Sequence, residues 1–163
     1  MRPVMPMSIL KYYRRSANNS VELMSNNQRS ALSSSTIDVR VYIEDTDAGG
    51  IVFYVNYLKY MERARTEFMR QLGLGKAAIF ADKLMFVVHS LTINYRAPAE
   101  LDDYLTVSAV VKKSSNVAVV FKQQVYRDNQ LLCEAEVKVA CVDRDTQQPA
   151  VMPESLIKQI MPN

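Results

Sequence analysis

The sequence contains few of the residues that build disulfides, metal sites and tight turns. Its 163 residues include two cysteines, one histidine and four glycines. Cys133 and Cys141 are eight residues apart in a predicted strand, which separates their Cα atoms by about 26 Å. A disulfide cannot span that distance, and the spacing suits no metal site. We therefore predict two free thiols, buried as small apolar side chains, in a reducing compartment such as the cytoplasm.

Long hydrophobic runs and a strong charge of one sign are also missing. No apolar run approaches the roughly 20 residues of a membrane-spanning helix, so we predict no stable membrane insertion. Five of the 20 basic residues but only one of the 17 acidic residues lie in 1–35. The other 15 basic and 16 acidic residues leave the rest of the chain almost neutral, which argues against nucleic acid as a partner.

Residues 1–35 differ in composition from the rest of the chain. Serine, asparagine, arginine and methionine dominate this stretch, and such a composition seldom forms a packed core. We predict a disordered N-terminal extension, or an upstream start codon with Met24 as the alternative start. An arginine- and serine-rich beginning is also typical of targeting segments, so a targeting or membrane-surface role is the competing interpretation. The folded domain is predicted to span 36–163.

Hydrophobic periodicity predicts one strand, one long helix and then a series of strands. Apolar and polar residues alternate over 37–43, as in a half-buried strand. Apolar residues then recur every three or four positions from Tyr57 to Leu72. This spacing indicates an amphipathic helix that stops at Gly73 and has Asn56 as its N-cap. Further strands are expected at 86–95, 105–111, 117–125 and 131–142, followed by a short C-terminal helix.

This order of elements predicts an α+β fold. One helix cannot cover both faces of a five-stranded sheet, but a curved antiparallel sheet can wrap around it on one face. We therefore predict a single domain in which a curved antiparallel sheet of about five strands surrounds one long helix. The exposed edge of such a sheet favours pairing with a second copy of the chain.

The segment Glu44–Tyr57, between the first strand and the helix, carries the residues that suit chemistry best. Asp45 and Asp47 share one face if this segment is extended, and the adjacent Gly49 and Gly50 let the backbone approach a substrate closely. The helix start that follows presents unpaired N–H groups and a partial positive charge. Acyl transfer requires such a combination, because the donors stabilise an oxyanion while the carboxylate attacks the carbonyl or activates water.

Three other interpretations of this segment compete with acyl transfer. An EF-hand calcium loop counted from Asp45 would need glycine at its sixth position and glutamate at its twelfth, whereas Gly49 falls fifth and Asn56 twelfth. A phosphate-binding P-loop would end in Gly-Lys-Ser/Thr, which this segment does not. An acidic turn that only caps the helix remains open from the residues alone.

The same segment resembles the hotdog-fold thioesterases of the 4-hydroxybenzoyl-CoA thioesterase type, and most closely their branch associated with the bacterial Tol-Pal system. The resemblance covers about 36–160 and excludes the N-terminal extension. It implies a hotdog domain that hydrolyses the thioester of an acyl-CoA, or of an acyl group on carrier protein, in the cytoplasm, as a homodimer or homotetramer without metal or other cofactor. It is carried by the stretches Tyr42–Tyr57, Met61–Glu67, Asn94–Asp103 and Glu134–Val137.

The resemblance also assigns roles within the motif. The catalytic carboxylate of the family, nucleophile or general base, corresponds to Asp47, and Asp45 corresponds to an accompanying acid with a structural role. The backbone N–H at Tyr54 or next to it corresponds to the donor that polarises the thioester carbonyl. Relatives in the Tol-Pal branch often have histidine at this position, whereas the hydroxybenzoyl branch has tyrosine. A non-catalytic hotdog protein that binds acyl thioesters, or that scaffolds envelope and lipid-synthesis proteins, is therefore the second hypothesis.

Other residues carry weaker predictions. Gly49 and Gly50 are expected to contact the substrate. Lys112, Lys113 and Ser114 fall in a predicted polar turn and would either meet the phosphates of CoA or form a solvated hairpin. His89, the only histidine, lies in a predicted strand, where a structural or surface role is the simpler interpretation. The apolar face of the helix is predicted to be core, with the lining of an acyl tunnel as the alternative.

Overall fold

The computed structural model describes residues 34–73 and 83–160. The predicted N-terminal extension lies outside these ranges apart from Ser34 and Ser35, and so remains a prediction. None of the helices in the described part of the chain has the length and apolar composition needed to cross a membrane.

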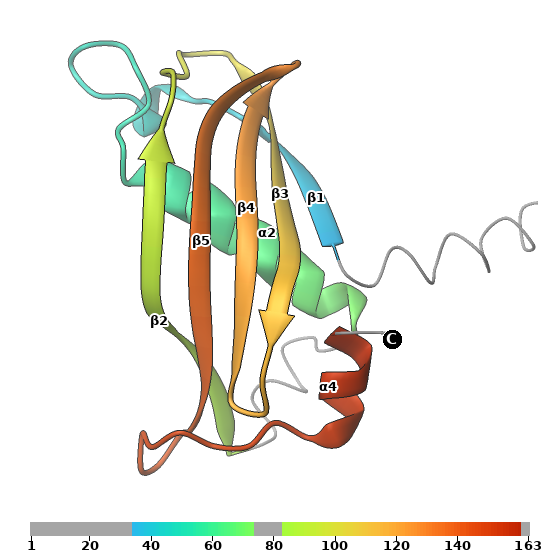
Figure 1. Cartoon of the computed structure of the whole chain (residues 1–163). Coiled ribbons are helices and arrows are strands. Elements are labelled where there is room, and N and C mark those ends of the chain that lie inside the picture. Colours follow the sequence, from blue (N-terminus) through green and yellow to red (C-terminus); the bar gives the residue numbers. More distant parts are fainter. Residues whose placement is uncertain (1–33, 74–82, 161–163) are drawn as a thin grey trace, which may run out of the picture. The chain divides into compact units, whose positions relative to one another are not determined.

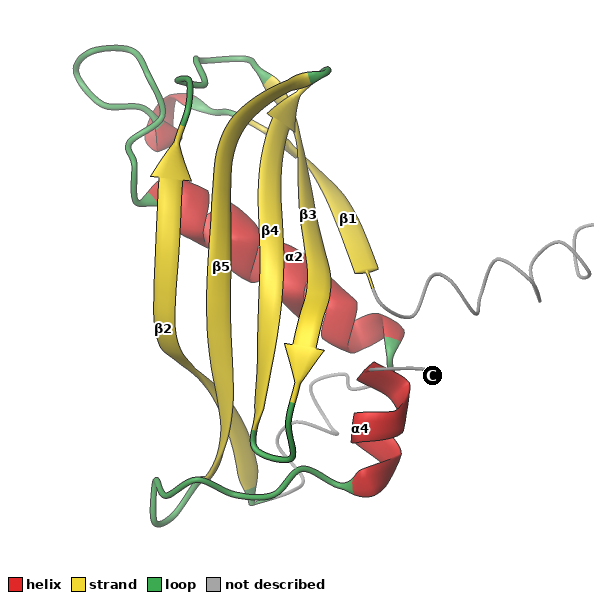
Figure 2. Cartoon of the chain, in the orientation of Figure 1, coloured by secondary structure: helices red, strands yellow, loops and turns green. Residues whose placement is uncertain are grey.

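Five strands form one antiparallel sheet in the order β1-β3-β4-β5-β2. The long helix α2 lies across one face of this sheet and packs against β1, β3 and β4 (Figures 1 and 2). This arrangement confirms the predicted α+β hotdog fold. The elements are β1 (Ser34–Arg40), the 3-10 turn η1 (Ile43–Asp45), α2 (Asn56–Gln71), β2 (Leu84–Tyr95), β3 (Tyr104–Ser114), β4 (Ala118–Arg127), β5 (Gln130–Asp143) and α4 (Glu154–Ile160).

The core lies between α2 and the sheet face that it covers. Along β5 every second side chain, from Cys133 to Cys141, is buried, as the alternation in the sequence predicts. Phe68 of α2 meets Phe121 of β4 edge to face, with ring centroids 5.4 Å apart. Met61 and Phe68 belong to this buried cluster, so the core interpretation of the helix face is confirmed for them.

The first strand differs from its prediction at both ends. It begins at Ser34, because Ser34 and Ser35 pair with Val110 and Ala109 of β3, and it ends at Arg40. Ile43, predicted to be the last inward residue of the strand, lies in η1 and is 73% exposed. Periodicity alone could not show that the chain turns at this point.

The start of α2 corrects a second prediction. Asn56 is the first helical residue and not the N-cap; Val55 holds the cap position with helical torsion angles and no side-chain hydrogen bond. The Asn56 side chain is buried and donates instead to the carbonyl oxygen of Asp45 at 2.7 Å. At the other end Gly73 adopts a φ of +75°, which confirms the predicted glycine stop.

A buried polar contact that the sequence did not predict joins α2 to β4. Arg65, 9% exposed, donates from Nη1 to Oε1 of Gln123 at 2.5 Å and forms an ion pair with Glu62. Gln123, fully buried, donates in turn from Nε2 to the carbonyl oxygen of Met61 at 2.9 Å. The charge of Arg65 therefore lies inside the helix–sheet interface with two acceptors.

Both cysteines are free and buried, as predicted. Burial raises the pKa of Cys133 to about 12, so at pH 8 the thiol stays protonated and unreactive. We expect a thiol-specific reagent at pH 8 to leave Cys133 unmodified in the native protein and to modify it rapidly in urea. Peptide mapping after labelling would detect this, and rapid labelling of the native protein would contradict the burial of Cys133.

Candidate active site

The residues between η1 and α2 form a tight hairpin that presents Asp47. Thr46 pairs with Val52, the Asp47 N–H donates to Ile51 O at 2.9 Å, and the Gly50 N–H donates to Asp47 O at 3.0 Å. Gly50 adopts a φ of +79°, a conformation that glycine reaches without strain. The glycine pair therefore serves first to close the turn behind the carboxylate.

Asp47 is exposed, and the described residues contact only one of its two carboxylate oxygens. Oδ1 accepts the N–H of Gly49 at 2.7 Å. A Cβ atom at position 49 would lie 3.1 Å from this oxygen, so glycine there also leaves room for the carboxylate. The second oxygen has no hydrogen-bond partner among the described residues, and the residue is exposed.

Asp45 holds the hairpin to the helix. Its Oδ2 accepts the N–H of Tyr42 at 3.0 Å, and its carbonyl oxygen accepts both the Phe53 N–H at 2.9 Å and the side chain of Asn56. These contacts fix the loop that carries Asp47 to the first turn of α2. Burial first, and then the nearby charge of Asp45, raise the pKa of the buried Tyr60 hydroxyl.

The backbone just before α2 offers a free donor beside an aromatic wall. The N–H of Tyr54 has no acceptor in the described part of the chain, while its carbonyl oxygen accepts the Tyr95 hydroxyl at 3.1 Å. Tyr54 meets Phe53 with ring centroids 4.7 Å apart and Tyr95 with centroids 6.3 Å apart. All three rings are between 43% and 59% exposed, so apolar surface adjoins the donor.

Ala99, in the segment before β3, is hydrogen-bonded to residues on both sides of Tyr54. The Val52 N–H donates to Ala99 O at 2.8 Å, and the Ala99 N–H donates to the Tyr57 hydroxyl at 2.9 Å. Burial raises the pKa of Tyr57, which keeps this hydroxyl neutral. The sequence did not predict that Tyr57 bonds to Ala99 or that Tyr95 packs against Tyr54. Neither residue stands out by spacing, and both contacts join residues more than 40 positions apart.

Lys112, Lys113 and Ser114 do not join Asp47 within this chain. They are the last three residues of the strand β3 and do not lie in the predicted loop. The hairpin of Asp47 instead contacts the segment that precedes β3. The length of β3 separates the two regions by roughly 33 Å. His89 is exposed in β2, at a register shift between Val88 and Ser90, and lies in a strand as predicted.

Gly50 gives a first test of the hairpin. Replacing it by alanine forces a Cβ into the left-handed region, which costs about 1–2 kcal/mol, although no atom within 4 Å obstructs the new Cβ. We expect the turn to open and the activity to fall while the fold is retained. The matched change Gly73→Ala, at a similar φ of +75° beyond the far end of α2, should cost similar stability but leave kcat unchanged. Equal losses of kcat in both variants would contradict a specific role of the hairpin.

Comparison with known proteins identifies the family of this chain. Residues 41–160 match the family model described as the thioesterase-like superfamily. The chain is 42% identical over 122 residues to the acyl-CoA thioester hydrolase YbgC of Escherichia coli O157:H7, covering 74% of this chain and 91% of that protein. It is likewise 42% identical over 119 residues to the acyl-CoA thioesterase YbgC of Haemophilus influenzae, covering 72% and 88%.

A solved structure shows the same fold. The probable thioesterase from Bartonella henselae superposes with a TM-score of 0.71 at 29% identity, covering 74% of this chain and all of that one. The range 41–160 of the family model includes the Asp47 hairpin, α2 and every strand after it. By sequence and by structure, the chain belongs to the thioesterase-like superfamily.

Proposed function

We propose that this protein hydrolyses the thioester of an acyl-CoA to a free acid and a thiol. One observation carries the proposal: within the described ranges, one carboxylate oxygen of Asp47 and the N–H of Tyr54 have no hydrogen-bond partner, and the hairpin of Asp47 is hydrogen-bonded to the start of α2. The named activities of the YbgC relatives support the choice of acyl-CoA as the substrate class. The non-catalytic hypothesis has no comparable support.

The chemistry follows from the two groups. The Tyr54 N–H, reinforced by the positive end of α2, would donate to the thioester carbonyl and stabilise the oxyanion that forms on it. Asp47 would take a proton from the attacking water, or would itself attack the carbonyl carbon to give an anhydride that water then hydrolyses. In either case the carbon–sulfur bond breaks and the thiolate leaves. Single-turnover hydrolysis in ¹⁸O-water separates the two routes, because only nucleophilic attack transfers label into Asp47.

The surroundings favour an apolar acyl group. The exposed rings of Phe53, Tyr54 and Tyr95 adjoin the donor, and aromatic walls of this kind bind apolar chains or rings. Hydrolysis of a panel of aliphatic and aromatic acyl-CoAs, together with one acyl carrier protein, tests the substrate class and identifies the carrier. Coenzyme A binding without turnover of any member would favour the non-catalytic alternative.

We further propose that the active unit is a dimer formed through β2. Among the described strands, β1 and β2 are the edges of the sheet. The side chains that β1 exposes are polar, which discourages edge pairing, whereas β2 exposes Val88, Leu91 and Tyr95. Two β2 strands paired about a twofold axis would run antiparallel. The end of the partner's sheet that holds the last residues of β3 would then lie near the Asp47 hairpin of this protomer. The lysines of β3 would then reach a substrate held at Asp47 of the other subunit.

The variant Leu91→Glu tests this interface. Two glutamates facing each other across the strand pair would repel and remain poorly hydrated, so we expect a shift from dimer to monomer in sedimentation equilibrium and a loss of activity. Val151→Glu, at a site that is 65% exposed outside the sheet, serves as the control and should remain dimeric. A wild-type protein that is monomeric at assay concentrations would rule out the proposed dimer.

We propose a cytoplasmic location and an association with the Tol-Pal system. The two free thiols suit a reducing cytoplasm, and an association with the Tol-Pal system follows from the family resemblance alone. Co-purification from cells with and without the Tol-Pal genes would test the second point.

A further inference from the structure

The hydroxyl of Tyr60 is buried without a hydrogen-bond partner. Among the buried side-chain nitrogen and oxygen atoms that the structure describes, it is the only one in this state. The side chain is fully buried in α2, and Tyr57 meets it with ring centroids 6.2 Å apart. Burying a hydroxyl removes its hydrogen bonds to water, so a hydroxyl without a partner in the protein is costly and rare. Such a group calls for a physical reason.

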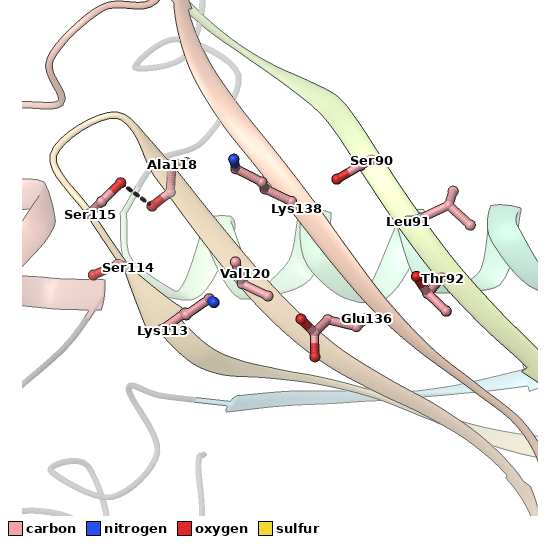
Figure 3. Close-up of a pocket in the computed structure, with 10 residues that line it drawn as sticks. All are labelled: Ser90, Leu91, Thr92, Lys113, Ser114, Ser115, Ala118, Val120, Glu136 and Lys138. Atoms are coloured by element: carbon pink, nitrogen blue, oxygen red, sulfur yellow. Dashed lines mark hydrogen bonds between the residues drawn. The ribbon is translucent and has the colours of Figure 1, made fainter.

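Unpartnered hydroxyls on the sheet face opposite α2 need no such reason. A hollow of about 320 Å³ opens there, and its lining includes Ser90, Thr92, Lys113, Ser114 and Lys138 (Figure 3). Ser90 and Thr92 are both exposed, so water can bond to their hydroxyls. Water does not reach Tyr60 in this way, because its side chain has no exposed surface. Its hydroxyl therefore lacks both kinds of partner.

The carboxylate of Asp45 lies close to the Tyr60 hydroxyl. Burial first, and then the charge of Asp45 and its contact with the hydroxyl, raise the pKa of Tyr60. This contact does not have the geometry of a hydrogen bond. Oδ2 of Asp45 accepts the Tyr42 N–H at 3.0 Å, and Oδ1 makes no hydrogen bond to a residue that the structure describes. A buried donor and an available acceptor therefore lie next to each other without a bond.

Substrate binding would change the surroundings of Asp45. Its side chain is half-buried, so water reaches it in the free protein. Its carbonyl oxygen accepts the Phe53 N–H at 2.9 Å, which places the residue next to the aromatic wall beside the Tyr54 donor. An acyl group packed on that wall would exclude water from Asp45. A carboxylate that loses water requires a donor from the protein, and Tyr60 holds such a donor.

We propose that Tyr60 is a positioning residue of the active site, whose hydroxyl donates to Asp45 when substrate is bound and so holds the hairpin that carries Asp47. The inference rests on the proposed thioesterase function and adds a residue to it. Without the hydroxyl, the dehydrated Asp45 carboxylate would turn toward solvent and release the Tyr42 N–H. Asp47 would then lie less often within reach of the thioester. The alternative is a hydroxyl that only fills space in the core.

The variant Tyr60→Phe tests the proposal, because it removes only the hydroxyl. We expect kcat for the best acyl-CoA to fall about tenfold while KM changes by less than about twofold. The urea midpoint should stay equal or rise, since the variant no longer buries an unbonded hydroxyl. Tyr126→Phe, at a half-buried position of β4, is the matched control and should change neither quantity. An unchanged kcat, or a lower urea midpoint, in Tyr60→Phe would overturn the proposal.

A double-mutant cycle tests whether Tyr60 acts through Asp45. Asp45→Asn removes the charge that the Tyr60 hydroxyl would hold, while the amide oxygen can still accept the Tyr42 N–H. We therefore expect D45N/Y60F to be no slower than D45N alone. A further tenfold loss of kcat in the double variant would contradict an action through Asp45.

The Tyr60 hydroxyl can also be followed directly. In protein labelled with ¹³Cζ-tyrosine, the Tyr60 resonance is identified by its absence in Tyr60→Phe. It should move when a non-hydrolysable alkyl-CoA thioether binds, because the hydroxyl then donates to a carboxylate. A resonance that stays in place at saturation would contradict the proposal. If the wild-type protein hydrolyses no acyl-CoA, the proposed function fails, while the urea comparison and this resonance still decide the role of the hydroxyl.

Discussion

Replacing Asp47 by asparagine is expected to lower kcat for acyl-CoA hydrolysis by about 10²–10⁴-fold. Asparagine has nearly the same shape, and its amide oxygen can still accept the Gly49 N–H that holds Asp47 at 2.7 Å. The hairpin should therefore persist, and the change removes only the charge and basicity of the free carboxylate oxygen. Because that oxygen is exposed and makes no contact in the described part of the chain, stability should change by less than about 0.5 kcal/mol.

The control for this variant is Glu44→Gln. Glu44 is an exposed acid of η1, three residues before Asp47, so its replacement changes the local charge by the same amount without touching the hairpin. Steady-state rates on the best acyl-CoA of the panel, with urea unfolding of each variant, provide the comparison. An Asp47→Asn enzyme with undiminished kcat would refute the assignment, and an equal loss in Glu44→Gln would reduce it to a general effect of charge.

Replacing Gln123 by leucine is expected to lower the free energy of unfolding by about 2–3 kcal/mol. The change removes the acceptor of the buried Arg65 guanidinium, which keeps only its ion pair with Glu62. It also removes the donor to the carbonyl oxygen of Met61. A buried charge that loses a partner costs more than the lost hydrogen bond is worth, because the desolvation of the charge is no longer compensated.

A double-mutant cycle makes this prediction specific. The variant R65M/Q123L lacks both polar groups. We therefore expect its loss in free energy of unfolding to be clearly smaller than the sum of the losses in the two single variants. Gln124→Leu serves as the control, because the neighbouring Gln124 side chain lies half-buried on the other face of β4; it should shift stability by less than about 0.5 kcal/mol. Strict additivity of the Arg65 and Gln123 effects in urea titrations would show that the contact does not couple α2 to β4.

Local patterns predicted most of the elements correctly. The alternation in β5 and the three- and four-residue spacing in α2 are set by which face of each element is buried, and so they are visible in the sequence. The family resemblance, rather than the spacing of the acids, singled out Asp47 from Asp45. The structure adds a physical distinction between them, because Asp45 uses its oxygens to hold the loop, while one carboxylate oxygen of Asp47 has no partner in the part of the chain that the structure describes.

The errors occur where a contact is made with a distant part of the chain. Asn56 suits an N-cap by residue type, but its amide binds the carbonyl oxygen of Asp45, eleven positions earlier. The helical spacing places Arg65 on the apolar face but does not show what pairs its charge; a glutamine from β4 accepts its hydrogen bond across 58 positions. The preference of a residue type for a position reflects its neighbours along the chain. It cannot predict a partner that only folding brings into contact.

The sequence by itself determined the fold class, the long helix with its glycine stop, the two unpaired thiols and the short segment that carries the acid and the glycine pair. These features depend on residue type and on near neighbours along the chain. Only the tertiary structure decided that Lys113 and Ser114 stand far from Asp47 in their own protomer and line a separate hollow with Lys138. That outcome depends on strand order and register, which place residues from β2, β3 and β5 together through contacts across many positions of the chain.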